Sequence, residues 1–221
     1  MVASLFLATA AVSITAAFFL DPMLNTPNYL AEIVPNKATL VLSAVLLSIN
    51  NIGIVFIAVY MYPMLRKLNE TAAAGYLAIR IIEGTVMMVG IAATLMLIPL
   101  GDSFVAAGAP PSSWYQTLGD LLKDGRFVGL RLISSPLLGL GGCIFTWQLI
   151  QARLVPRFIA VVGFIGYVMI FFPGVAAWFG AIDLAPGSSG MFVAIPVALF
   201  EIILLPLWLF FRGFKMPDAT V

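Results

Sequence analysis

Residues 38–62 read ATLVLSAVLLSINNIGIVFIAVYMY, a run of 25 residues without a charged side chain. An α-helix rises about 1.5 Å per residue, and crossing the hydrocarbon core of a bilayer takes about 20 predominantly apolar residues. An amphipathic helix of a soluble protein would carry polar residues every three or four positions, and a strand of a membrane barrel would alternate. The stretch shows neither repeat, so it predicts a membrane-spanning helix.

Five further runs share this character, which predicts an all-α, single-domain integral membrane bundle of six transmembrane helices. The predicted spans are residues 2–20, 38–62, 72–99, 128–150, 156–181 and 190–211. Composition agrees, because 62% of the 221 residues are hydrophobic and 10% are charged, whereas a soluble domain averages about 25% charged residues. No basic residue precedes the first run, unlike in a secretory signal peptide, so we interpret it as the first span.

The basic residues predict the orientation, because cytoplasmic loops of membrane proteins carry an excess of Lys and Arg. If the N-terminus is cytoplasmic, the cytoplasmic connections and tail hold six basic residues and the opposite side holds three. The cytoplasmic six are Arg66, Lys67, Arg153, Arg157, Arg212 and Lys215, and the external three are Lys37, Lys123 and Arg126. Both termini are therefore predicted to be cytoplasmic.

The longest predicted external loop, residues 101–127, contains an amphipathic stretch. A proline- and serine-rich start is followed by apolar residues at Trp114, Leu118, Leu121 and Leu122. This spacing predicts a short helix, and Trp favours the depth of the lipid headgroups. We expect an interfacial helix between spans 3 and 4, with a lid or a partner surface as its alternative role.

Polar side chains interrupt three of the spans at a similar depth. They are Asn50 and Asn51 in the second span, Arg80 and Glu83 in the third, and Glu201 in the sixth. Counted from the cytoplasmic ends of the spans, they lie about 12–17 Å deep. A charged side chain at the bilayer centre costs about 3 kcal/mol on insertion scales, so we expect these groups to face inward and to contact one another. Arg80 and Glu83 are three residues apart on one helix, which is close enough to pair.

Two interpretations of this polar layer remain open. The simpler one is a structural staple, in which an ion pair and the two amides hold spans 2, 3 and 6 in register. The alternative is a site for a proton, an ion or a small ligand. Pro196 and Pro206 on either side of Glu201 favour this alternative, because interrupted helices build many transporter sites. A cavity that reaches Glu83 or Glu201 would favour transport, and dry packing would favour the staple.

Other residues within the spans have predicted structural roles. Arg131 lies near the outer end of the fourth span, and we expect its side chain to reach the headgroups as an anchor. Small residues let membrane helices approach closely. We assign this packing role to Gly139, Gly141 and Gly142 in span 4 and to Gly163 and Gly166 in span 5.

The residue types that are missing exclude several classes of function. Histidine is absent and Cys143 is the only cysteine, so the chain lacks the usual ligands of haem, copper and catalytic zinc and the usual neutral-pH general base. It contains no HExxH, GxSxG or Walker A motif, and a net charge of +1 offers nucleic acid no electrostatic footprint. We therefore expect that the protein is not an enzyme and that it binds no metal, cofactor or nucleic acid. The expected partners are membrane lipids, and other membrane subunits or a second copy of the chain.

Short segments spread over nearly the whole chain form a distinctive set, most of all within residues 60–83 and 154–163. They are DPMLN (21–25), PNY (27–29), YPMLRKLNE (62–70), GY (75–76), Arg80, Glu83, LVPR (154–157), IA (159–160), Gly163, AIP (194–196), Glu201, Trp208 and GF (213–214). Together they resemble the bacterial multi-pass membrane proteins grouped as domain of unknown function 4386, although residues 101–127 diverge. The resemblance implies a six-span prokaryotic protein of the inner membrane and supplies no activity.

A non-enzymatic membrane protein is the function that these observations favour. It would be a small binding or sensing bundle, or an accessory membrane subunit, with a buried polar layer. The alternative is a minimal transporter or proton-coupled permease that uses the cluster of Arg80, Glu83, Glu201, Asn50 and Asn51 near the middle of the membrane.

The predicted orientation is tested by reporter fusions or cysteine labelling at Asn69 and Ser188. With six spans and cytoplasmic termini, Asn69 is cytoplasmic and Ser188 is external, because these residues lie in connections on opposite sides. Labelling of Asn69 from outside the cell, or of Ser188 from the cytoplasm only, would overturn the orientation.

Overall fold

The structure is a computed structural model that describes residues 1–110, 113–185 and 187–214. Its long helices are α1 (Val2–Leu24), α3 (Lys37–Leu65), α4 (Glu70–Ala106), α5 (Trp114–Phe127), α6 (Ser134–Ala152) and α7 (Arg157–Trp178). Two short elements, α2 (Tyr29–Ile33) and the π-helical turn η1 (Val128–Ile133), lie between them. The C-terminal segment consists of the 3₁₀ turn η2 (Ser189–Ala194), α8 (Ile195–Ala198), the π-helical turn η3 (Leu199–Leu204) and α9 (Leu205–Phe211). Every element in the described residues is helical, which confirms the all-α prediction.

Six helical stretches of the described residues are long and apolar enough to cross a membrane, as predicted. They are Val2–Leu24, Lys37–Leu65, Glu70–Ala106, Trp114–Ala152, Arg157–Trp178 and Ser189–Phe211. The third and fourth stretches are longer than the predicted spans 72–99 and 128–150. With 37 residues, α4 measures about 55 Å, so it exceeds a hydrocarbon core of about 30 Å even when it is tilted.

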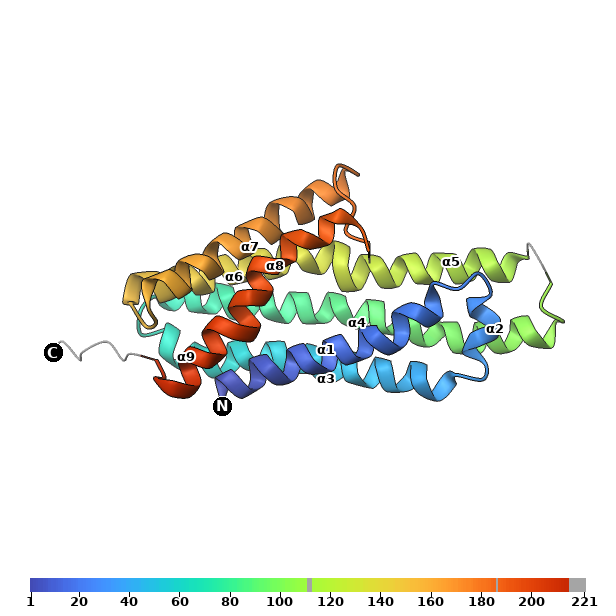
Figure 1. Ribbon diagram of the computed structural model, residues 1–221, viewed down its shortest axis with the longest axis horizontal. Coiled ribbons are helices and arrows are strands. Elements are labelled where there is room, and N and C mark those ends of the chain that lie inside the picture. Colours follow the sequence, from blue (N-terminus) through green and yellow to red (C-terminus); the bar gives the residue numbers. More distant parts are fainter. Residues whose placement is uncertain (111–112, 186, 215–221) are drawn as a thin grey trace.

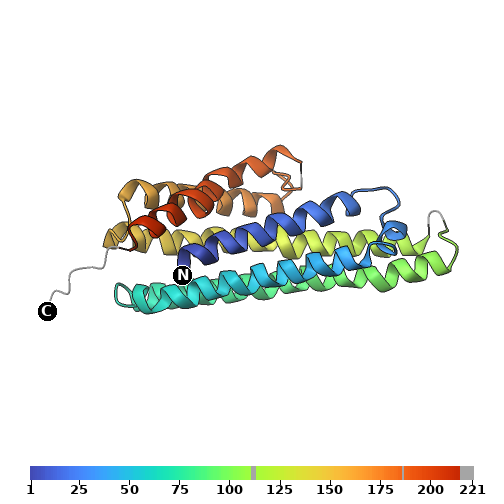
Figure 2. The same cartoon turned by 60° about the horizontal axis from the view of Figure 1, so that its bottom comes forward.

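The spans form a closed ring (Figures 1 and 2). α1 packs along α3, α3 along α4, α4 along α6, and α6 along α7. The C-terminal segment packs on α7 through α8 and returns to α1 through η3 and α9, so the last span contacts the first. In Figure 1, α7 and the C-terminal segment are inclined to the other helices.

The two ends of the ring differ in charge. One end, which we call the basic end, carries Arg66, Lys67, Arg153, Arg157 and Arg212. The opposite, acidic end carries Asp21, Glu32, Asp102, Asp120, Asp124 and Asp183. Lys215, which also entered the charge comparison, lies outside the described residues, and the orientation of the ring in the membrane stays a prediction.

The helix predicted at Trp114 is present, but the structure does not support a separate interfacial helix. α5 continues through η1 into α6 without a break, and together they form the single stretch Trp114–Ala152. One physical reason is that the sequence contains no proline between Trp114 and Pro136 that could end the helix. A second is that α4 runs past its predicted end to Ala106 and gives α5 a partner along its length.

Polar contacts join the helices at the acidic end. The Arg126 guanidinium donates to Asp21 at 2.7 Å, and Lys37 Nζ donates to Asp102 at 2.7 Å. The Tyr29 hydroxyl donates to Asp120 at 2.9 Å. Burial, and next this hydrogen bond, raise the pKa of Tyr29 well above its ordinary value, so the hydroxyl remains a donor at neutral pH.

Two apolar cores fill the ring near its two ends. The basic-end core includes the buried residues Phe6, Ile57, Tyr76, Phe145 and Phe200. The acidic-end core includes Leu20, Leu30, Leu40, Leu97 and Phe104. The predicted polar layer lies between these cores, as expected for charged groups that cannot face lipid.

Glycines allow the close helix approach that the sequence predicted. A Cβ atom on Gly139 would lie 2.7 Å from the Phe171 Cα, and one on Gly166 would lie 2.8 Å from the Val197 amide nitrogen. These glycines therefore place α7 directly against the backbones of α6 and of the C-terminal segment.

Gly139→Ala is expected to destabilise the protein. The new methyl group meets backbone that cannot rotate away, and overpacking of this kind costs about 1–3 kcal/mol. Gly75→Ala is the matched control, because a Cβ there meets nothing within 4 Å and alanine favours a helix by about 0.5–1 kcal/mol. Melting in detergent should show a lower Tm for Gly139→Ala and an equal or higher Tm for Gly75→Ala. Equal melting of the two variants would contradict the close contact.

Candidate functional site

The buried ion pair predicted between Arg80 and Glu83 is present in α4. Arg80 Nη1 donates to Glu83 Oε2 at 3.0 Å, and each side chain is 4% exposed. Glu201, from η3, places Oε1 3.9 Å from Arg80 Nη2, and its side chain is 26% exposed. One guanidinium thus links the third span to the sixth. Of the two acids it contacts, only Glu201 is accessible.

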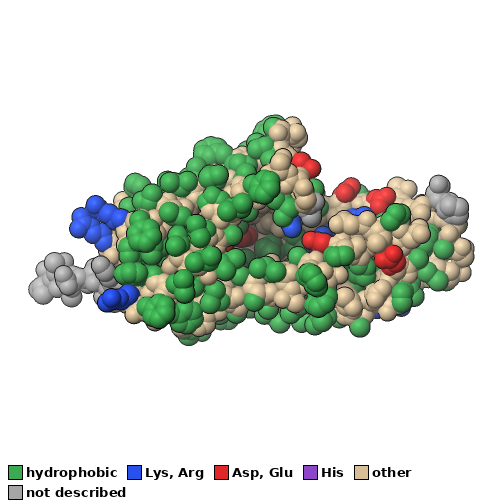
Figure 3. Space-filling model, viewed as in Figure 1, with side chains coloured by type: hydrophobic (Ala, Val, Ile, Leu, Met, Phe, Trp, Pro, Cys, Tyr) green, Lys and Arg blue, Asp and Glu red, His purple; other side chains and the backbone are tan. Residues whose placement is uncertain are grey.

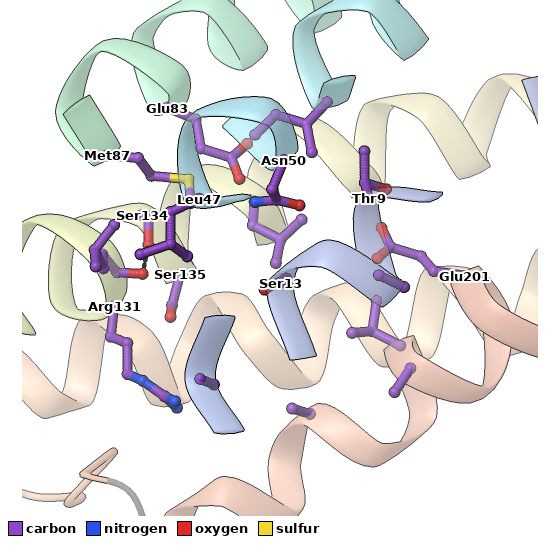
Figure 4. Close-up of a pocket in the computed structure, with 18 of the residues that line it drawn as sticks. Thr9, Ser13, Leu47, Asn50, Glu83, Met87, Arg131, Ser134, Ser135 and Glu201 are labelled. Atoms are coloured by element: carbon purple, nitrogen blue, oxygen red, sulfur yellow. Dashed lines mark hydrogen bonds between the residues drawn. The ribbon is translucent and has the colours of Figure 1, made fainter. Parts of the chain in front are cut away.

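The two asparagines of the predicted layer have different surroundings. The Asn51 amide donates to the Gly84 carbonyl oxygen at 2.7 Å, which ties α3 to α4. Asn50 is directed into a cavity (Figure 4) and has no hydrogen-bonding partner for its side chain among the described residues. The structure therefore brings all five predicted residues to one level, but it gives Asn51 a stapling role that Asn50 does not share.

Two tyrosines belong to the site and were not predicted. Tyr167 of α7 is fully buried and donates its hydroxyl to Glu201 Oε1 at 2.5 Å. The Arg80 guanidinium lies 5.5 Å from the centre of the Tyr76 ring, within the range of a cation–π contact. A signal existed for both residues, because Tyr76 precedes Arg80 by four positions in α4 and Tyr167 lies about 15 Å from the start of α7, at the depth of Glu201.

A cavity of about 420 Å³ reaches the polar layer. Figure 3 shows it as a hollow in the side of the bundle, below the inclined α7 and C-terminal segment, with acidic side-chain atoms visible inside. The polar residues of its wall are Thr9, Ser13, Asp21, Asn50, Arg80, Glu83, Arg126, Arg131, Ser134, Ser135 and Glu201. The layer is therefore not closely packed on this side, and its accessible acid faces a space wide enough for a small molecule.

Arg131 lines the cavity, which its predicted role as a headgroup anchor did not foresee, and that role stays a prediction. The residue lies in η1, and its side chain lines the large cavity together with Ser134 and Ser135 (Figure 4). It also lines a second cavity of about 80 Å³ beside η2. The prediction of a headgroup anchor rested on depth alone, and depth does not tell which way a side chain of a helix points.

Comparison with known proteins bears on the family and not on the activity. The profile of a family described as a domain of unknown function, DUF4386, matches residues 1–213. The chain belongs to the DUF4386 family. This confirms the resemblance seen in the sequence, and the bacterial origin implied by that resemblance stays a prediction. No curated protein and no solved structure matches the chain.

The three charged side chains of the layer in this DUF4386 member do not balance when all are ionised. Arg80 carries one positive charge against two carboxyl groups, so the ionised cluster has a formal charge of −1. A proton or a small cation at Glu201 would neutralise it, because Glu201 is the member of the cluster that the cavity exposes. Among the described residues no group of three or more His, Cys, Asp or Glu side chains could hold a metal ion.

Further polar atoms are buried between the layer and the basic end. The Tyr76 hydroxyl, both amide atoms of Gln148 and the Trp208 indole nitrogen lack a hydrogen-bonding partner among the described residues. Gln148 lies about 6 Å and Trp208 about 5 Å from the basic ends of their helices. Buried polar groups of this kind are costly unless a partner satisfies them, so the basic-end core is not uniformly apolar.

Arg80→Ala is expected to lower the Tm in detergent markedly. Removing one partner of a buried ion pair costs about 3–5 kcal/mol, whereas replacing both partners by apolar residues is often mild. The double variant Arg80→Leu/Glu83→Leu should therefore recover much of the loss. Lys37→Ala is the control, because the Lys37–Asp102 pair is about half exposed and such pairs contribute about 0–1 kcal/mol. A thermally silent Arg80→Ala would show that the pair does not anchor the layer.

Proposed function

We propose that this protein is a non-enzymatic ligand-binding protein of the membrane, and that its site is the Glu201 end of the cavity. The ligand presents a positive charge, either a proton or an organic ammonium group. The protein then acts as a small sensor or as an accessory binding subunit. In this proposal the chain lies in the inner membrane of a bacterium with its basic end in the cytoplasm, so that the cavity opens in the outer half of the membrane.

The observation that carries this proposal is the unequal exposure of the three charged side chains. Arg80 and Glu83 are 4% exposed, whereas Glu201 is 26% exposed and faces the cavity. A staple alone would not need an accessible acid, because exposure to water weakens an ion pair. Tyr167 occupies one oxygen of Glu201, which leaves the other oxygen for a ligand.

A non-enzymatic role fits the chemistry of the wall. Its hydroxyl groups, Thr9, Ser13, Ser134 and Ser135, have no histidine, cysteine or lysine beside them in the wall. Activated nucleophiles ordinarily depend on such a neighbour. The hydroxyls and the Asn50 amide instead offer hydrogen bonds to a bound molecule.

The test uses octylammonium as a probe and the protein in nanodiscs of phosphatidylcholine. Octylammonium is expected to raise the Tm of the unmodified protein in a saturable manner, since a ligand at 100 times its Kd contributes about 2.7 kcal/mol. Glu201→Gln should abolish this rise, because it removes the accessible negative charge with little change of shape.

Glu70→Gln is the matched control, because Glu70 is exposed at the basic end and lies outside the cavity wall. It should respond to octylammonium as the unmodified protein does. An equal rise of the Tm in Glu201→Gln would refute Glu201 as the ammonium site.

A proton-coupled transporter is the second candidate. It is supported by the cavity that reaches both glutamates and by the buried polar atoms between the layer and the basic end. Transport needs a second conformation in which the basic-end core opens, and those atoms of Tyr76, Gln148 and Trp208 would then line the path. Proteoliposomes that contain a pH-sensitive dye would decide between the candidates. Proton movement that Glu201→Gln abolishes favours transport, and a tight membrane favours the binding role.

A further inference from the structure

Arg131 is the charged residue of the cavity wall that makes the fewest hydrogen bonds and ion pairs. Its neighbour Arg126 is bound to Asp21 at 2.7 Å, and Arg80 is bound to Glu83 at 3.0 Å. The Arg131 side chain makes no hydrogen bond or ion pair with the other described residues, yet it lines both cavities. A guanidinium has five N–H donors, and one without a partner in a partly buried site is a strong anion-binding group.

The cavity is long and has opposite charges at its two ends. Its wall on α1 extends from Phe6 to Asp21, about 22 Å of helix. At the acidic end Asp21, Arg126 and Arg131 have a formal charge of +1, and at the layer the Arg80 cluster has a formal charge of −1. A volume of about 420 Å³ along this length describes a narrow passage, which suits an extended molecule with different groups at its ends.

The backbone around the two charged ends is unusual in the same way. Each of the two π-helical turns in the described residues carries one charged residue of the cavity wall, Arg131 in η1 and Glu201 in η3. Single π-helical turns are rare and occur frequently at functional sites, where they redirect a side chain. This links Arg131 to Glu201 independently of the cavity itself.

The opening of the cavity faces sideways. The contacts of α1 with the C-terminal segment lie mainly at η3 and α9, and the hollow appears in the side of the bundle where α7 and the C-terminal segment incline away (Figure 3). Ile14, at the rim, is 62% exposed. In a membrane this side faces lipid chains, so a ligand with an apolar middle can enter from the bilayer.

We propose that Arg131 forms a second, anion-binding subsite of the cavity, and that the ligand is an amphiphile with two charged ends. Its carboxylate or phosphate binds Arg131, its apolar chain lies along α1, and its ammonium group binds Glu201. This inference rests on the proposed ammonium site at Glu201 and adds the other end of the ligand.

Three probes of equal chain length test the inference at neutral pH in phosphatidylcholine nanodiscs. They are octylammonium, octanoate and 8-aminooctanoate, which carries both charges. The unmodified protein should bind 8-aminooctanoate about tenfold or more tightly than octylammonium, the gain expected from one hydrogen-bonded charge. Arg131→Gln should remove this preference and leave octylammonium binding unchanged, which also shows that the variant is folded. Arg131→Lys should keep part of the preference.

Arg157→Gln is the control, because Arg157 is exposed at the basic end and lies outside the cavity wall. It should keep the full preference for 8-aminooctanoate. If Arg131→Gln keeps that preference, or if the unmodified protein shows none, the second subsite is wrong while the ammonium site stands. If octanoate alone binds and Glu201→Gln does not weaken 8-aminooctanoate, the ammonium site and the two-ended ligand are both wrong.

Discussion

Hydrocarbon cannot solvate the Arg80 guanidinium, and the arrangement of the third, fifth and sixth spans follows from that constraint. A lone charge at this depth is expensive, so Arg80 is stabilised by Glu83 on its own helix, by Glu201 on η3 and by the ring of Tyr76. Glu201 in turn accepts from Tyr167 on α7. The contact with Glu201 also ties the last span to α4, between the two apolar cores, while the ring itself closes where η3 and α9 pack on α1.

Most of the fold could be predicted because a bilayer leaves the chain few choices. Backbone polar groups must be satisfied inside each span, so a long apolar run can only become a helix. The six spans follow from that rule alone. The rule does not predict that α5 continues into α6. The helix there depends on its packing against the extended end of α4, and the length of α4 reflects packing at the acidic end rather than hydropathy.

The residues of the candidate site could be predicted from the sequence where their transfer into lipid costs much free energy. Arg80, Glu83, Glu201, Asn50 and Asn51 stand out in the sequence because each is expensive in lipid, and the structure brings them to one level. A tyrosine costs less than a charge at that depth, so Tyr167 stood out only by its position level with Glu201, a weaker signal than that of the charged residues. Arg131 did not stand out, because an arginine near the end of a span can reach the headgroups at little cost in free energy. The direction of its side chain depends on the π-helical turn at η1, and no hydropathy pattern encodes that turn.

Small residues show most clearly why the cavity could not be read from the sequence. Gly139 and Gly166 remove side chains so that α7 can touch its neighbours. Small residues also recur every three or four positions along one face of α1, at Ala10, Ser13 and Ala17, and of the C-terminal segment, at Ala194 and Ala198. These five residues nevertheless line the cavity instead of a helix contact. Packing is so favourable that helices bearing small faces ordinarily close on one another. Here the inclination of α7 and its close backbone contact with the C-terminal segment hold that segment away from α1 at the acidic end, while the basic-end core fixes it at the other. The cavity persists because the contacts that hold the ring together lie on either side of it. The charged residues at its two ends determine which groups it could accommodate.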